Sequence, residues 1–151
     1  MGYAKPFVPT PMKSSPEQGR EGQSGRFEVW GAGFLAVGTV CGALGAHALK
    51  AVLSAGSLDS WKTASMYMLV MGVGLIGANR STTTLAAQRM LGAVVLGTCL
   101  FSGSIVGLVA LSGMEGFGSL RAVLGPLTPI GGLLMIGGWA GWAWNRHLDL
   151  K

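Results

Sequence analysis

The sequence predicts an all-α membrane protein, a four-transmembrane-helix bundle with an extended N-terminal tail. Half of its 151 residues are apolar and only 11% are charged, whereas soluble domains usually carry about 25% charged residues. Four stretches without any charged residue contain 21, 17, 25 and 24 residues. A helix needs roughly 17–25 apolar residues to cross a bilayer, so all four stretches are long enough, the second only just. None alternates polar and apolar residues as a β-barrel strand does.

Residues 1–26 form a separate polar tail before the predicted helical domain at 27–147. The tail is rich in Pro, Ser, Gly and Gln and has no apolar stretch. Such a composition cannot bury a core alone, and it matches neither a secretory signal nor a transit peptide. Myristoylation would need Ser or Thr where Pro6 stands. We therefore expect this tail to dock on a neighbouring subunit.

Within the domain, helices are predicted at about 28–49, 61–79, 88–112 and 125–145, with turns at 56–59, 79–84 and 113–119. The fourth helix is expected to open with Pro126 and Pro129 in its first turn, where a missing backbone donor costs no hydrogen bond. Thr128 could cap that helix. The sequence therefore predicts a stiff start to the fourth span.

The distribution of Lys and Arg predicts the orientation of the bundle. With four spans, both termini and the middle loop share one side, which carries eight of the eleven basic residues. The positive-inside rule places this side in the mitochondrial matrix or the bacterial cytoplasm. The net charge of +5 is thus mainly a topology signal, reinforced by anionic lipid headgroups, and we expect no nucleic acid partner. The arginines expected at lipid headgroups are Arg26, Arg80, Arg89 and Arg146.

Glycines four residues apart recur in three of the four apolar stretches, at a spacing that lets helices approach closely in lipid. The pairs are Gly38 with Gly42, Gly103 with Gly107, and Gly137 with Gly141. Packing inside the bundle is the favoured interpretation, and a docking face for a partner subunit is the alternative. The segment 72–77 also spells the glycine pattern of dinucleotide-binding proteins, but it lies inside an apolar stretch rather than between a strand and a helix.

Residues that could carry chemistry are sparse. His47 is the one histidine at the end of an apolar stretch, and no acid lies inside any of them. Ser102 and Ser104 sit midway along the third stretch, where serines usually bond a backbone carbonyl or another helix. Cys41 and Cys99 are expected to behave as small apolar residues. We therefore expect no catalytic, cofactor-binding or metal-binding residues and no enzyme activity.

Three colinear segments, 42–50, 100–113 and 125–139, joined by 61–67, resemble the bacterial and mitochondrial membrane family that includes transmembrane protein 256. The resemblance implies a small four-helix membrane protein without established catalytic activity. It also implies motif positions at Gly45, His47, Ser102, Ser104, Pro126, Thr128, Pro129 and Gly131. Members often carry a second histidine where Met71 stands here, so a paired-histidine site is not expected.

From these features we expect a non-catalytic accessory subunit of a mitochondrial inner-membrane complex, first a respiratory complex or supercomplex and second an ATP synthase. It would act by helix packing, tail docking and lipid contact, with both termini in the matrix. Its partners would be other subunits and lipids such as cardiolipin. The alternative is a free-standing small transporter or channel, in which polar side chains face a pathway. A bacterial plasma membrane is the alternative location.

Overall fold

The computed structural model describes residues 25–82, 84–112 and 114–150, and every regular element in these ranges is helical. The elements are α2 (Arg26–Ala46), the short 3₁₀ turn η1 (Leu49–Ala51), α3 (Ala55–Asn79), α4 (Leu85–Ala110) and α5 (Gly118–Asp149). The predicted all-α class is therefore confirmed for this part of the chain. Of the predicted docking tail at 1–26, residues 1–24 lie outside the described residues, and Arg26 already belongs to α2.

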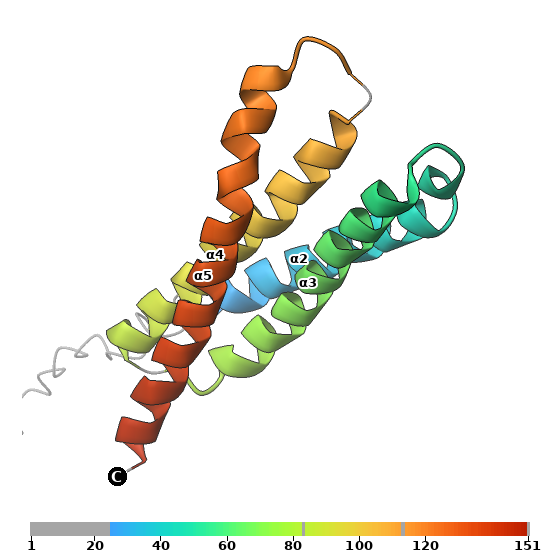
Figure 1. Cartoon of the computed structure of the whole chain (residues 1–151). Coiled ribbons are helices and arrows are strands. Elements are labelled where there is room, and N and C mark those ends of the chain that lie inside the picture. Colours follow the sequence, from blue (N-terminus) through green and yellow to red (C-terminus); the bar gives the residue numbers. More distant parts are fainter. Residues whose placement is uncertain (1–24, 83, 113, 151) are drawn as a thin grey trace, which may run out of the picture.

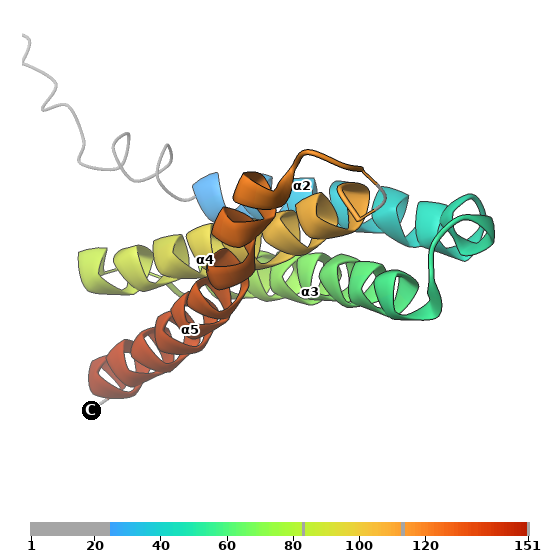
Figure 2. The same cartoon turned by 45° about the horizontal axis from the view of Figure 1, so that its top comes forward.

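The helices form two antiparallel hairpins, α2 with α3 and α4 with α5 (Figure 1). Contacts within each hairpin are extensive, and α3 against α4 provides the main contact between the hairpins. The hairpins diverge toward the end that carries their two tight connections, η1 and the loop before α5 (Figure 2). The order in space is thus α2, α3, α4, α5, with the two middle helices holding the bundle together.

Three helices, α2, α4 and α5, are long and apolar enough to cross a membrane. The remaining predicted span, the second along the chain, corresponds to α3, which falls short of that standard although it has 25 residues. Its first half is polar and includes an exposed ion pair, with Lys62 Nζ 3.5 Å from Asp59 Oδ1. That α3 also crosses the bilayer stays a prediction, and its apolar part is the segment 66–78.

The start of the fourth predicted helix differs from the structure. α5 begins at Gly118, so Pro126 and Pro129 lie inside the helix rather than in its first turn. Each proline removes one backbone donor, which leaves the carbonyls of Ala122 and Gly125 without their usual helical partners. The prediction was wrong because proline is favoured in the first turn of a helix, but a membrane helix also tolerates it in its interior when neighbouring groups compensate. Thr128 consequently is not an N-cap.

The N-caps of the two middle helices follow the usual chemistry. Ser54 Oγ accepts a hydrogen bond from Ser57 N at the start of α3. Thr84 Oγ1 accepts one from Ala87 N at the start of α4. Ser and Thr are favoured at this position because they satisfy free backbone donors. These caps start α3 and α4 earlier than the predicted residues 61 and 88.

The closest helix approaches occur where glycine faces glycine. A Cβ atom built on Gly31 would lie 2.7 Å from the carbonyl oxygen of Gly72, which brings α2 against α3. A Cβ on Gly97 would lie 2.7 Å from the carbonyl oxygen of Gly131, which brings α4 against α5. Close backbone approach gives van der Waals contact that lipid tails cannot replace. Each hairpin therefore contains one contact in which glycine faces glycine.

Candidate functional site: a hydroxyl-lined seam and cavity

A chain of side-chain hydrogen bonds crosses all four helices near the middle of the bundle. Ser65 Oγ of α3 donates to Gly38 O of α2 at 2.7 Å, and Ser102 Oγ of α4 donates to Ala64 O of α3 at 3.1 Å. Ser104 of α4 and Thr128 of α5 share a hydrogen bond of 2.7 Å between their hydroxyl oxygens. All three serines are buried. We call these bonded groups the hydroxyl seam.

The structure thus brings three of the motif positions together. Ser104 and Thr128 are direct partners, and Gly131 lies one turn along α5 from Thr128, against Gly97 of α4. Thr98, which is fully buried, donates back to Val94 O at 2.8 Å. The seam's hydroxyls therefore act in helix association, which matches the usual role of serine and threonine in lipid.

His47 is placed apart from the seam. It follows the last residue of α2 as the C-cap, its side chain is exposed, and its backbone N–H bonds Ala43 O at 3.2 Å. Gly45, the neighbouring motif glycine, packs against Trp61, whose Cδ1 would lie 2.9 Å from an added Cβ. Trp61 Nε1 donates to Cys41 O at 2.7 Å. The motif around His47 therefore serves the α2–α3 contact.

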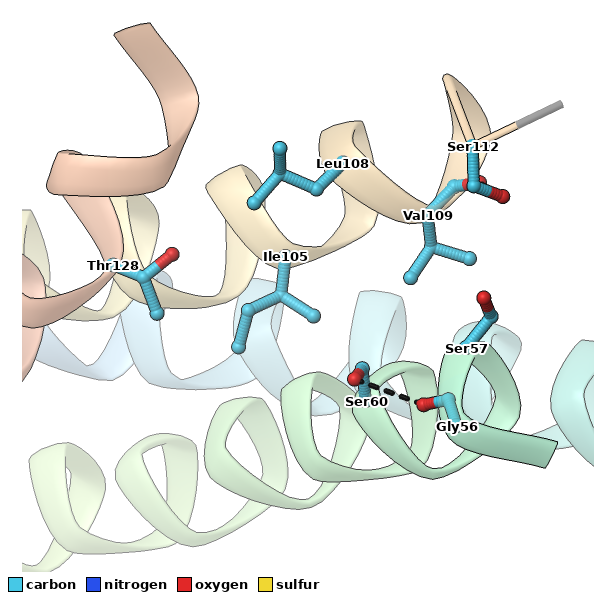
Figure 3. Close-up of a pocket in the computed structure, with 8 residues that line it drawn as sticks. All are labelled: Gly56, Ser57, Ser60, Ile105, Leu108, Val109, Ser112 and Thr128. Atoms are coloured by element: carbon cyan, nitrogen blue, oxygen red, sulfur yellow. Dashed lines mark hydrogen bonds between the residues drawn. The ribbon is translucent and has the colours of Figure 1, made fainter. Parts of the chain in front are cut away.

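A cavity of about 450 Å³ opens beside the seam, between the start of α3, the end of α4 and α5 (Figure 3). Its lining combines hydroxyl groups with aliphatic side chains: Gly56, Ser57, Ser60, Ile105, Leu108, Val109, Ser112 and Thr128. Ser60 and Ser112 donate to carbonyls of their own helices, at 3.0 Å to Gly56 O and 2.8 Å to Val109 O. Among the residues that the structure describes, none of those lining this cavity is ionisable, so it suits a neutral molecule or an acyl chain.

The six predicted packing glycines fall into two groups. Gly38 and Gly42 face α3, where added Cβ atoms would lie 3.0 Å from Leu69 Cδ2 and 3.2 Å from Ser65 Oγ. Gly141 faces Met90, and Gly107 faces Leu124 at 3.1 Å. Cβ atoms added to Gly103 and Gly137, by contrast, would meet nothing within 4 Å. These two glycines therefore point away from the helix contacts of the described chain.

Met71, for which the resemblance implies a histidine in other members, lies against α5. Its sulfur accepts a hydrogen bond of 3.1 Å from Trp139 Nε1. The same helix places Trp142 Nε1 2.9 Å from Thr82 Oγ1, in the turn between the hairpins. Within the described ranges, no group of three His, Cys, Asp or Glu side chains could hold a metal ion.

The four predicted headgroup arginines lie near the ends of helices. Arg80 follows α3 as its C-cap, and Arg146 is in the last turn of α5. Arg26 and Arg89, near the starts of α2 and α4, line one cleft. Arg121, on the opposite side, instead donates to Leu111 O and to Met114 O, the latter at 2.8 Å, and so closes the α4–α5 loop.

Sequence reasoning missed several groups that connect the helices, chiefly Ser65, Trp61 and Asn79. Asn79 is buried and its Nδ2 donates to Glu28 Oε1 of α2 at 3.1 Å. The available signal was spacing, since Trp61, Ser65 and Met68 share one face of α3 at intervals of three and four residues. All three are buried there.

The fold and its satisfied interior hydroxyls define the class of this protein, a helical membrane protein. Residues 41–132 match the family described as Protein of unknown function (DUF423). A UPF0382 membrane protein of Schizosaccharomyces pombe is 41% identical over 109 residues, which cover 72% of this chain and 88% of the relative. A UPF0382 membrane protein of Staphylococcus saprophyticus is 38% identical over 107 residues, covering 70% and 81%.

The chain therefore belongs to the DUF423 family of membrane proteins. This confirms the resemblance to a membrane family of unknown function, which has relatives in both a yeast and bacteria. No solved structure matches this chain.

Proposed function

We propose that this protein is a non-catalytic accessory subunit of a larger membrane assembly, in the first instance a respiratory complex or supercomplex of the mitochondrial inner membrane. An ATP synthase comes second as the assembly. Its termini would lie in the matrix, and it would act by packing against neighbouring subunits and lipids. In a bacterial setting the same role would be played in the plasma membrane.

The observation that carries this proposal is an outward face of α5. Ile130, Leu133, Gly137 and Trp144 follow each other at helical spacing on one side. The three large side chains are 46%, 69% and 66% exposed, and the glycine between them has open space in front of it. A small residue flanked by large apolar ones is the pattern that lets a second helix approach in lipid.

The hydroxyl seam supports the same proposal. Its three serines bond groups on neighbouring helices, and the buried Thr98 bonds a carbonyl of its own helix. Polar groups in membrane spans that serve a transport pathway face a cavity. In this protein the hydroxyls of the seam instead bond groups on adjacent helices, which suits a packing role.

Sizing the complex tests this role. We expect the native protein, released from membranes with a mild detergent, to migrate with other subunits at high mass. Gly137→Leu should lower the apparent mass toward that of the single chain, because the new side chain fills the space on the α5 face. Ala143→Leu, on another exposed face of α5, is the matched control and should leave the mass unchanged. A native protein that runs as a lone monomer would contradict the proposal.

The cavity beside the seam favours a second candidate, a small pathway for a neutral polar solute. Thr128 is the residue that joins this cavity to the seam. Under the subunit proposal, liposomes containing the full chain should take up glycerol no faster than protein-free liposomes. Glycerol uptake that exceeds this background and falls in Thr128→Val would favour transport over packing.

A further inference from the structure

Arg26 and Arg89 line a cleft of about 230 Å³ at the end of the bundle where α2 and α4 begin. The start of α2 lies beside the first half of α4 in both views (Figures 1 and 2). The remaining lining residues are Phe27, Leu85, Gln88 and Gly92. The cleft therefore combines two cationic groups and an amide with an apolar floor.

The two guanidinium groups are available to a ligand. Within the described ranges, neither Arg26 nor Arg89 forms an ion pair or a side-chain hydrogen bond with another residue. Both residues are exposed, and no carboxylate among the described residues lines the cleft. Glu28, the nearest acid on α2, is held by Asn79 of α3. The first turns of two helices add partial positive charge at the same end. The cleft is thus electrostatically suited to an anion.

An apolar groove lies farther along the same two helices, with Met68 of α3 also in its lining. It has a volume of about 350 Å³ and is lined by Trp30, Gly33, Phe34, Val37, Met68, Thr98, Cys99, Ser102 and Gly103. The hydroxyls of Thr98 and Ser102 are bonded to backbone carbonyls at 2.8 and 3.1 Å, so they add little polarity. We call this surface the α2/α4 groove.

Glycines keep the groove open. Added Cβ atoms on Gly33, Gly92 and Gly103 would meet nothing within 4 Å. Gly92 belongs to the cationic cleft and the other two to the groove. These glycines are therefore not explained by helix contacts within the described chain, and they leave room for a long, thin ligand.

We propose that the cleft and the groove together bind one anionic phospholipid. Its phosphate lies between Arg26 and Arg89, which can donate paired, charge-assisted hydrogen bonds to phosphate oxygens. One acyl chain lies along the groove. The helix rise from Arg26 to Val37 is about 16 Å, close to half of the roughly 30 Å hydrocarbon core. The site thus has the dimensions of one lipid in one leaflet, and it does not depend on the subunit role proposed above.

Native mass spectrometry of the full-length protein tests the charged half of the site. The protein is titrated with phosphatidylglycerol or with phosphatidylcholine in the same micelle. We expect tighter binding of phosphatidylglycerol, weakened at least about tenfold in the double variant Arg26→Gln/Arg89→Gln, because charge-assisted bonds are lost. The control Arg80→Gln/Arg146→Gln removes the same charge elsewhere and should change little. Equal losses in both variants would overturn the proposal.

Filling the groove tests the apolar half. Gly33→Leu and Gly103→Leu have room for their side chains and leave all charges in place, so they should fold and still lose phosphatidylglycerol. Gly137→Leu, where the added side chain points outside the groove, should bind lipid normally.

Displacement of the lipid by inorganic phosphate would mean that the cleft recognises a free anion. Unchanged lipid binding in Arg26→Gln/Arg89→Gln, with new protease cuts in residues 1–24, would mean that the tail occupies the cleft. Either result would contradict the proposal.

Discussion

Replacing Gly131 by alanine should destabilise the α4–α5 hairpin by about 1–3 kcal/mol, the usual cost of overpacking a close contact. The added Cβ would lie 2.5 Å from Phe101 N and 2.7 Å from Gly97 O. Both are backbone atoms of a helix, so neither can move without shifting α4. Thermal unfolding of the purified protein in micelles, followed by circular dichroism, measures this loss.

The neighbouring glycine supplies the control. A Cβ on Gly132 would meet only Phe101 Cδ2 at 3.8 Å, an ordinary contact. Gly132→Ala should therefore leave the unfolding temperature unchanged or raise it, since alanine favours the helix over glycine by about 1 kcal/mol. Equal effects at positions 131 and 132 would show that helix propensity, and not the approach of α4, governs this region.

Replacing Gly72 by alanine should separate α2 from α3 in the same way. The new Cβ would lie 2.7 Å from Gly31 O and 3.2 Å from Leu35 N, so the backbone of α2 must move. Cys41, buried in this hairpin, reports the change. We expect a membrane-permeable maleimide to label Cys41 several-fold faster in Gly72→Ala than in the unaltered protein.

Two comparisons separate a local effect from general unfolding. Gly77→Ala, on the same helix with open space before it, should leave the labelling of Cys41 unchanged. Cys99 is already exposed, so its labelling should stay constant in all variants. Faster labelling of Cys41 in Gly131→Ala as well would show that the hairpins do not open independently.

Charge-free stretches were enough to predict the helical class and the approximate position of all four helices, because hydrocarbon excludes charge and forces backbone groups into helices. They could not place the helix starts. The caps Ser54 and Thr84 lie outside the stretches, and the first turns of α5 precede Pro126. Polar residues in the first half of α3 similarly belong to a helix without belonging to an apolar span.

The site was predicted in its parts and not in its arrangement. Ser104 and Thr128 were chosen as motif positions, but only the packing of α4 on α5 makes them partners. Spacing of four residues found Gly38 and Gly42, which face α3. It missed Gly31, Gly97 and Gly138, whose added Cβ atoms would meet backbone carbonyl oxygens of the facing helix. Sequence spacing shows which residues share one face of a helix. How closely two helices approach depends on the residues of the facing helix, which spacing does not reveal.

The two-hairpin arrangement also bears on how the chain enters its membrane. Each hairpin pairs two helices that are neighbours in sequence, and the α3–α4 contact is the main contact between the two pairs. During synthesis, α2 and α3 can therefore associate before α4 has left the ribosome. The later pair then docks through groups already in place, such as the carbonyl of Ala64 that receives Ser102. If α3 also crosses the bilayer, insertion by consecutive pairs would give this weakly apolar helix α2 as a neighbour from the start.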